Sequence, residues 1–201
     1  MYQNNIKRIC DLIVAVPLLL FLTPLLLFVA LLIKFDSKGA VIFRQSRGGF
    51  AGVFFEILKF RSMAERKESD GKDFEPGSGM RVTRVGAIIR KTKVDELPQL
   101  INVIKGDMSL VGPRPEVRKY IEMFPERWNK ILSIRPGITD PASVEFRNEE
   151  EILAAAKDPE REYVEKVLPR KLDLYEKYVD DITFLGDLKV IVATFAAILG
   201  F

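Results

Sequence analysis

The sequence contains no histidine, which removes the usual proton shuttle near neutral pH and the commonest metal ligand. Its single cysteine, Cys10, excludes an internal disulfide, fits a reducing compartment and is expected to pack at the border of an apolar run. Net charge is also low: 31 Lys and Arg offset 28 Asp and Glu to give +3, which argues against a dedicated nucleic-acid binder. Catalysis would therefore need carboxylates, Lys, Tyr or hydroxyl groups, and a metal would be a hard, oxygen-bound ion such as Mg²⁺.

The chain of 201 residues, 48% of them apolar, can bury one ordinary core. We predict two parts: a segment with basic flanks in residues 1–40 and one folded domain in residues 41–201. The fold class that the patterns favour is α/β (α+β), mainly helical with a small β-hairpin or sheet.

Residues 12–33 carry no charge and are numerous enough to cross a bilayer core of roughly 30 Å as a helix. The run is longer than the apolar part of a usual signal peptide, and "KFDSKGAVIF" follows it instead of a cleavage site. We therefore expect a retained membrane segment.

Whether this segment spans the membrane is a separate question. Positive charge marks the cytoplasmic side, and basic residues stand on both flanks: Lys7, Arg8, Lys34, Lys38, Arg44 and Arg47. Thr23 and Pro24 lie mid-segment, where proline removes a backbone donor and the threonine hydroxyl can bond a freed carbonyl. These features are compatible with a re-entrant helix bent at Thr23-Pro24 and equally with a kinked spanning helix.

The stretch "VIFRQSRGGFAGVFFEILKFRSM" predicts two strands joined by a glycine-rich turn. Period-2 alternation in the second strand places Phe55, Ile57, Lys59 and Arg61 on one face. The two cations could hold a phosphate, or they could simply be a solvated strand end. Residues 64–80 are polar and glycine-containing, which predicts a loop.

A helix is expected from Thr83, with Arg90, Lys91 and Lys93 near its end, and another through Leu97 to Ile104. The stretch "KVDELPQL" between them contains Asp95 and Glu96. Asp95 at or next to an N-cap would explain the pair structurally. The functional alternative is that nearby Lys and Arg keep both carboxylates ionised, so that one attacks phosphorus while its neighbour binds Mg²⁺.

Further along, Arg114 lies between two prolines that fix its backbone, which is typical of an aimed ligand contact. Charged helices are expected after Arg147, and one of them contains Asp173. The apolar C-terminal stretch from Phe184 is expected to form a helix that packs on the core or lies in the membrane interface.

The order "KFRSM", "RKTKVDELPQLINVIKGDMSLVGPRP" and "RPGIT", after a basic-flanked apolar segment, closely resembles the bacterial sugar transferase family of small monotopic phosphoglycosyl transferases. The similarity covers nearly the whole chain. It departs after "RPGIT", where many members continue "GWAQVNGR" and this chain has "DPASVEFR". The segment from Arg147 to Asp173 is also longer than in small members, so the sugar is left open.

The resemblance implies a Mg²⁺-dependent transfer of sugar 1-phosphate from a UDP-sugar to polyprenyl (undecaprenyl) phosphate, with release of UMP. It implies a covalent phosphosugar on Asp95 and a metal bound by Glu96. Positive charge would come from Lys59, Arg61, Arg90, Arg114 and Arg147, and Lys59, Arg90, Arg114, Arg147 and Asp173 match positions that the family uses around its site. The domain would face the cytoplasm, held on the bacterial inner membrane by the re-entrant helix and interfacial amphipathic helices.

Two other functions remain open at this stage. A non-enzymatic module could grip anionic membrane lipid with its basic residues. A membrane phosphatase with an aspartyl nucleophile would hydrolyse instead of transferring. The sequence permits a homodimer, but no feature argues for one.

Overall fold

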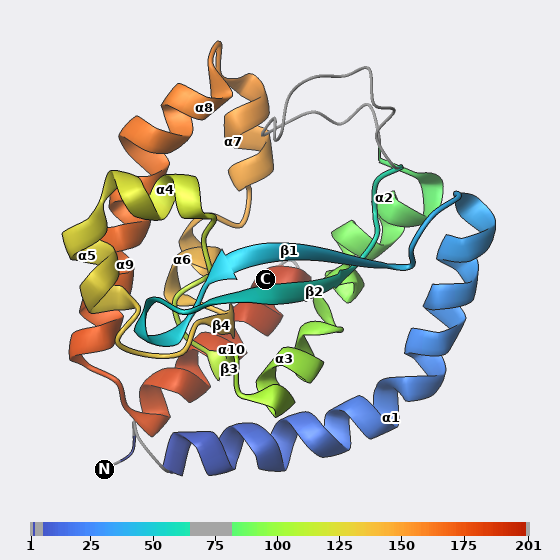
Figure 1. The fold of residues 1–201 in the computed structure, drawn as a ribbon, viewed down its shortest axis with the longest axis horizontal. Coiled ribbons are helices and arrows are strands. Elements are labelled where there is room, and N and C mark those ends of the chain that lie inside the picture. The colour runs from blue at the N-terminus through green and yellow to red at the C-terminus, as the bar shows by residue number, and fades with distance from the viewer. Residues whose placement is uncertain (1, 3–5, 65–81, 200–201) are drawn as a thin grey trace.

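The computed structural model describes residues 2, 6–64 and 82–199 and is shown in Figure 1. These residues are mostly helical, with two small two-stranded sheets and one long apolar N-terminal helix. This confirms the expectation of a mainly helical α+β chain with a small hairpin. The loop predicted over residues 64–80 lies, apart from residue 64, outside the described residues.

Helix α1 (Lys7–Asp36) runs along one edge of the molecule and then turns up along a second edge (Figure 1). Its first half packs Ala15 against β2 and α3, and its second half packs Val29 and Ile33 against the end of β2 and α2. Two prolines lie inside the helix, and the hydroxyl of Thr23 bonds the carbonyl of Leu19 at 2.8 Å. Proline and such back-bonding both bend helices, so the curved path has local causes.

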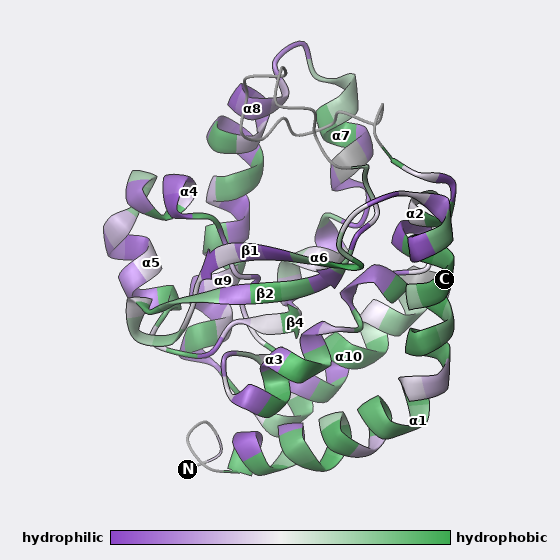
Figure 2. Cartoon of the chain, turned by 45° about the vertical axis from the view of Figure 1, so that its right-hand side comes forward, coloured by the Kyte–Doolittle hydropathy of each residue, from purple (hydrophilic) through white to green (hydrophobic). Residues whose placement is uncertain are grey.

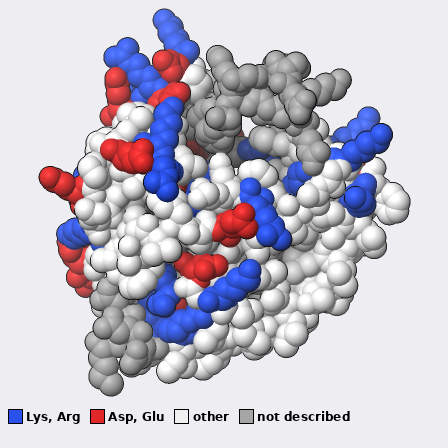
Figure 3. All heavy atoms as spheres, in the orientation of Figure 1, with Lys and Arg blue, Asp and Glu red and all other residues white. Residues whose placement is uncertain are grey.

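The outer side of α1 exposes a long apolar surface, visible as green ribbon in Figure 2 and as an uncharged lower right margin in Figure 3. The helix is long and apolar enough to cross a membrane by length and composition. Large side chains that it exposes include Ile9, Ile13, Leu20, Phe21, Leu27, Phe28, Leu31 and Phe35.

Strands β1 (Ile42–Gly48) and β2 (Phe54–Phe60) form the predicted antiparallel hairpin, with Ile42 opposite Phe60 and Gly48 opposite Phe54. A short 3₁₀ turn, η2 (Phe50–Gly52), joins them. The β-branched and aromatic residues favour these strands, and Ile57 on β2 is buried against α1 and α3.

Three short elements follow in the candidate site region: α2 (Arg84–Lys91), the 3₁₀ turn η5 (Val94–Glu96) and α3 (Gln99–Lys105). The side chain of Thr83 caps α2 by accepting a bond from the Gly86 amide at 3.0 Å. Gly106 ends α3 in the left-handed conformation that glycine adopts without strain.

Strands β3 (Ser109–Val111) and β4 (Gly137–Thr139) pair in parallel, and their backbones approach closely at Gly137 in β4 and Gly112, just after β3. A Cβ on Gly137 would lie 2.1 Å from the amide nitrogen of Gly112, and one on Gly112 would lie 2.5 Å from the Arg135 carbonyl. Real side chains do not tolerate such contacts, so both positions require glycine.

Apart from α10 (Phe184–Leu199), which lies beside the start of α1, the remaining helices lie toward the end of the hairpin away from the second half of α1 (Figure 1). They bury a core around Trp128, Leu172 and Tyr175. Their bounds are α4 (Arg118–Met123), α5 (Pro125–Ile131), α6 (Pro141–Glu145), α7 (Glu149–Ala155), α8 (Pro159–Glu162), the π-helix η6 (Tyr163–Val167) and α9 (Leu168–Asp180).

Helix α10 is the C-terminal apolar helix that the sequence predicted, and it does pack on the core. Its inner side places Val190 and Ile191 against Val111, Ile134 and Tyr178. Its other side exposes Leu185, Leu188, Val192 and Phe195. The helix is therefore apolar on both sides, with one side left uncovered.

Candidate active site

Asp95 and Glu96 lie in η5, the single 3₁₀ turn between α2 and α3. The N-cap of η5 is Lys93 and that of α3 is Pro98, and neither helix start has a side-chain cap. The expectation that Asp95 caps a helix is therefore wrong. The turn that contains Pro98 separates the acidic pair from α3. The Asp95 carboxylate therefore caps neither η5 nor α3.

Backbone strain lies directly beside the acidic pair. Lys93 has φ 57° and ψ 15°, the left-handed conformation, which costs a residue with a Cβ about 1 kcal/mol. This conformation breaks the path between α2 and η5 and turns Val94 to Glu96 into the molecule, where Asp95 is buried. Non-glycine residues in this region cluster at functional sites.

Glu96 is held by two cations from distant parts of the chain. Lys59 on β2 donates to Glu96 Oε1 at 2.8 Å, and Arg114 donates to the same oxygen and, at 3.4 Å, to Oε2. The Glu96 side chain is only 15% exposed. Three of the predicted site residues, from β2, η5 and the link after β3, are therefore brought together in one ion-paired cluster.

The electrostatics of the two acids differ. Burial alone would raise the pKa of Glu96, but the charges and hydrogen bonds of Arg114 and Lys59 outweigh it and hold this pKa well below its ordinary value. Burial and then the charge of Glu96 raise the pKa of Asp95, although Lys59 and Lys93 oppose this shift. The expectation that cations keep both carboxylates ionised thus holds in direction for Glu96, whereas Asp95 is shifted the other way.

The cations of the cluster respond to the same surroundings. Burial, and then the nearby Arg114, lower the pKa of Lys59. Glu96 raises the pKa of Arg114 well above its ordinary value. The cluster therefore holds two positive and two potentially negative groups, and its net charge is close to zero. A phosphate that binds there would meet cations that are already in place.

Two buried polar atoms at this turn have no hydrogen-bond partner in the described structure: Asp95 Oδ1 and Gln99 Nε2. Gln99 is 1% exposed. Buried polar atoms are paired in the great majority of cases, so an unpaired carboxylate oxygen and, four residues further on, an unpaired amide nitrogen favour a ligand-binding role. The Asp95 oxygen is not engaged by any cation that would have to be displaced before it reacted.

Asn102 fixes α3, and with it η5, against β2. Its amide oxygen accepts from the Leu58 amide at 3.0 Å, and its amide nitrogen donates to the Glu56 carbonyl at 2.8 Å. Asn102 is 1% exposed. A buried side chain that satisfies two strand groups ties the carboxylate turn to the strand that carries Lys59.

Glu116 anchors the rigid loop that carries Arg114. Its carboxylate accepts from Arg47 Nη1 at 2.9 Å and from the Tyr163 hydroxyl at 2.6 Å, while its carbonyl accepts from the Gly48 amide at 2.9 Å. The loop is therefore tied at Glu116, two residues after Arg114, both to β1 and to η6. The sequence reasoning did not single out Glu116.

The remaining predicted site residues lie apart from the Glu96 cluster or make other contacts. Arg61 is buried and donates to the carbonyl and hydroxyl oxygens of Ser37 at 2.7 and 2.9 Å, at the end of α1. Arg90 is half-buried in the last turn of α2, and Arg147 is exposed between α6 and α7. Asp173 is exposed on α9 and pairs with Arg127 on α5 at 2.7 Å. Roles for these four in substrate binding stay predictions.

Comparison with known proteins agrees with the motifs. The family model described as bacterial sugar transferase matches residues 2–200. The chain is 36% identical over 194 residues to the uncharacterized sugar transferase EpsL of Bacillus subtilis, across 96% of this chain and 87% of that relative. It is 44% identical over 142 residues to a UDP-N-acetylgalactosamine-undecaprenyl-phosphate N-acetylgalactosaminephosphotransferase of Aeromonas hydrophila. It is 41% identical over 141 residues to a UDP-glucose:undecaprenyl-phosphate glucose-1-phosphate transferase of Caulobacter vibrioides.

The chain therefore belongs to the bacterial sugar transferase family. The latter two matches each cover 69% of this chain, but only 34% of the Aeromonas relative and 53% of the Caulobacter relative. Their printed names describe transfer of different sugars, N-acetylgalactosamine and glucose. The family is established by these matches, and the sugar is not.

Proposed function

We propose that this chain transfers a sugar 1-phosphate from a UDP-sugar to a polyprenyl phosphate, undecaprenyl phosphate in bacteria, and releases UMP. The observation that carries the proposal is the buried Asp95 carboxylate with an unpaired oxygen, next to a Glu96 held by Lys59 and Arg114. Relatives named as UDP-sugar and undecaprenyl-phosphate sugar phosphotransferases are 44% and 41% identical to this chain over 142 and 141 residues, which supports the proposal.

In the first step, the Asp95 carboxylate attacks the phosphorus that bears the sugar. An Asp oxygen–phosphorus bond forms, the bond from that phosphorus to the bridging oxygen breaks, and UMP leaves with that oxygen. Lys59 and Arg114 lie beside the acids and offset the negative charge of the diphosphate as the carboxylate approaches. The raised pKa of Asp95 records the cost of holding this charge in a buried place before the donor binds.

In the second step, a phosphate oxygen of the polyprenyl phosphate attacks the same phosphorus. The new oxygen–phosphorus bond forms as the Asp95 oxygen–phosphorus bond breaks, which returns the carboxylate and yields a polyprenyl diphosphate sugar. Each covalent bond that forms is matched by one that breaks, so no hydrolysis is needed.

Mg²⁺ fits the residues present. Within the described residues, no group of three or more His, Cys, Asp or Glu side chains could hold a metal alone. Mg²⁺ is commonly bound by one or two carboxylates together with substrate phosphates and water, and Asp95 Oδ1 is free of protein hydrogen bonds. Glu96, with Asp95 beside it, would hold the ion, which would supply charge neutralisation to the diphosphate.

The same proposal places the catalytic domain on the cytoplasmic face of the bacterial inner membrane, with α1 as a re-entrant helix. A straight helix of 30 residues would be about 45 Å long and would put its ends on opposite sides of a bilayer. In the structure, Lys7 near one end and Ile33 near the other both pack against the same domain. Because both ends of α1 contact one folded unit, the helix would enter and leave the membrane on the same side, in keeping with the basic residues on both of its flanks.

Purified protein with Mg²⁺, polyprenyl phosphate and a panel of UDP-sugars tests the activity. Release of UMP together with a lipid-linked sugar, lost in Asp95→Asn, is the expected result. No UMP from any sugar would leave a lipid-binding module as the better description, because such a module needs no Asp95. Free sugar phosphate without lipid-linked product would favour a phosphatase.

A further inference from the structure

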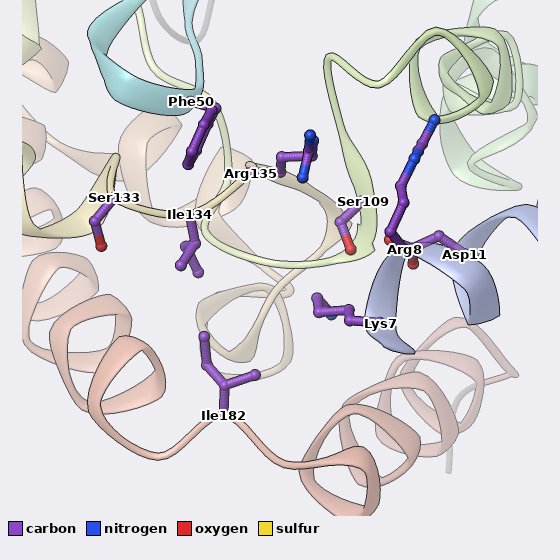
Figure 4. Close-up of a pocket in the computed structure, with 9 residues that line it drawn as sticks. All are labelled: Lys7, Arg8, Asp11, Phe50, Ser109, Ser133, Ile134, Arg135 and Ile182. Atoms are coloured by element: carbon purple, nitrogen blue, oxygen red, sulfur yellow. The ribbon is translucent and has the colours of Figure 1, made fainter. Parts of the chain in front are cut away.

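A polar cavity lies away from Asp95, at the start of α1 (Figure 4). It has a volume of about 350 Å³. It is lined by side chains from α1, from β3 and from the segment before β4. The charged ones are Lys7, Arg8, Asp11 and Arg135. Arg8 bonds the carbonyls of Val103 and Ile104 and Arg135 bonds that of Gly106, at the end of α3 away from the acidic pair.

Two of the lining groups have bonding capacity directed at the cavity. Ser109 is 2% exposed; its hydroxyl lies close enough to Asp11 to oppose the rise of the Asp11 pKa, but it completes no well-formed hydrogen bond within the described residues. Arg135 uses Nε to bond the Gly106 carbonyl at 2.8 Å and holds its guanidinium 5.3 Å from the centre of the Phe50 ring, while its two terminal nitrogens make no hydrogen bond in the described part of the chain. An unpaired buried hydroxyl and a guanidinium with two available donor nitrogens match the oxygens of a phosphate group.

The charge balance of the cavity is also positive. Lys7 is paired with the buried Asp187 on α10, so these two charges cancel. Asp11, which accepts from the Leu110 amide at 3.0 Å, is set against Arg8 and Arg135. The cavity therefore carries about one net positive charge and suits a singly charged anion such as a phosphate diester.

An apolar surface begins at the edge of the same cavity. Ile182 lines it, and α10 continues from there with the exposed residues Phe184 and Leu185. On α1, Ile9 and Ile13 are exposed on the side of the helix away from Lys7 and Asp11. A ligand with an anionic head in the cavity would have the apolar surface of α10 for its tails, which an inorganic phosphate would not use.

We propose that this cavity binds the phosphate diester headgroup of an anionic membrane phospholipid, such as phosphatidylglycerol, in addition to the substrates at Asp95. A lipid seated there would be held by Arg135 and Ser109, while Arg8 and Arg135 keep their bonds to α3 and Gly106. The site would fix the start of α1 at the height of the headgroups. It does not depend on the transfer reaction.

The test uses the full-length protein in a neutral detergent and native mass spectrometry with phosphatidylglycerol, phosphatidylcholine or inorganic phosphate. Wild type is expected to retain phosphatidylglycerol about tenfold better than phosphatidylcholine and not to retain inorganic phosphate. Arg135→Gln and Ser109→Ala should each lose most of this preference, whereas Arg161→Gln, an exposed arginine on α8, should keep it. Asp95→Asn should also keep it, which separates this lipid from one in the active site.

Equal retention of the two lipids by wild type, or an unchanged preference in both cavity variants, would overturn the proposal. Retention of inorganic phosphate as strongly as lipid would overturn the assignment to a membrane headgroup. If Arg135→Gln unfolds, as judged by circular dichroism, Ser109→Ala decides, because it removes only one unpaired hydroxyl.

Discussion

Arg114 donates to both carboxylate oxygens of Glu96, so a residue fixed between Pro113 and Pro115 is tied to the acid next to Asp95. Lys59 reaches the same carboxylate from β2. The Arg114–Glu96 pair thus joins the loop after β3 to the η5 turn through one buried contact. Its removal should be felt in stability as well as in activity.

Glu96→Gln should lower the free energy of unfolding by about 2–4 kcal/mol, because it leaves two partly buried cations without their anion. Urea unfolding at pH 7 measures this. Glu122→Gln, which removes an exposed acid paired only with Arg118, is the control and should change stability by less than about 0.5 kcal/mol. Equal effects of the two substitutions would contradict the buried ion-pair cluster.

Because the pKa values of Asp95 and Glu96 are shifted in opposite directions, the two acids should affect the pH dependence of stability in opposite ways. The pKa of Glu96 is lowered in the folded chain, so its contribution is fully present above its ordinary value of 4.5 and is lost as pH falls below it. The pKa of Asp95 is raised, so its ionisation costs stability as pH rises from its ordinary value of 3.8. Relative to wild type, Glu96→Gln should lose less stability on acidification, whereas Asp95→Asn should lose more. Shifts of the same sign in both variants would contradict these environments.

Gly137→Ala should destabilise the chain by about 3 kcal/mol or more, because the new Cβ would meet the Gly112 backbone at 2.1 Å. Gly52→Ala is a graded control. It has open space around it but a φ of +75°, so only the left-handed conformation is penalised, by about 1 kcal/mol. Thermal unfolding of both variants would test the close packing of β3 and β4, and a smaller loss in Gly137→Ala than in Gly52→Ala would contradict it.

The bend of α1 can be tested by replacing Thr23 and Pro24 together with leucine, which restores the missing backbone donor. Ile6→Cys in a Cys10→Ala background leaves one cysteine near the start of α1. Labelling of this cysteine with a membrane-impermeant maleimide shows on which side of the membrane that end of the helix lies. With the native pair, labelling should require broken cells. With the leucine pair, a straight helix should expose the cysteine outside intact cells, and Pro17→Leu alone serves as a control. Labelling of the native pair in intact cells would establish a spanning helix.

Much of the local structure followed from the sequence. The alternation of residues predicted the glycine-rich hairpin, Thr83 marked the start of the next helix, and apolar composition predicted the long N-terminal helix. The helix cap was one of two roles that the surroundings of Asp95 allowed, and only the path of the chain excludes it. The left-handed Lys93 and the turn through Pro98 move α3 away from Asp95.

Other parts of the site could not be read from one sequence, because they depend on contacts across long separations. Glu116 meets Arg47 and Tyr163 from three separate segments, and no local pattern marks it. Asn102 did leave a signal, a polar residue inside an apolar helical pattern. Gly112 and Gly137 also stand in quoted motifs, but their need for glycine appears only when the two strands lie side by side.

Asp95→Asn should lose transfer activity while keeping the fold. Asp95 caps no helix and its Oδ1 bonds no group in the described chain, so the amide removes a buried charge without breaking a recorded hydrogen bond. The free energy of unfolding at pH 7 should be unchanged or higher by up to about 1 kcal/mol. Activity should fall by three orders of magnitude or more, measured as UMP release. An active Asp95→Asn protein would rule out the aspartyl intermediate.

The most direct measurement is the intact mass of the protein after incubation with Mg²⁺ and a panel of UDP-sugars in the absence of lipid acceptor. We predict a mass increase of one sugar phosphate on the wild-type chain, with one donor or a few, and none on Asp95→Asn. UMP release that begins only when polyprenyl phosphate is added, with no adduct at any time, would contradict the covalent mechanism and indicate direct transfer between the two substrates.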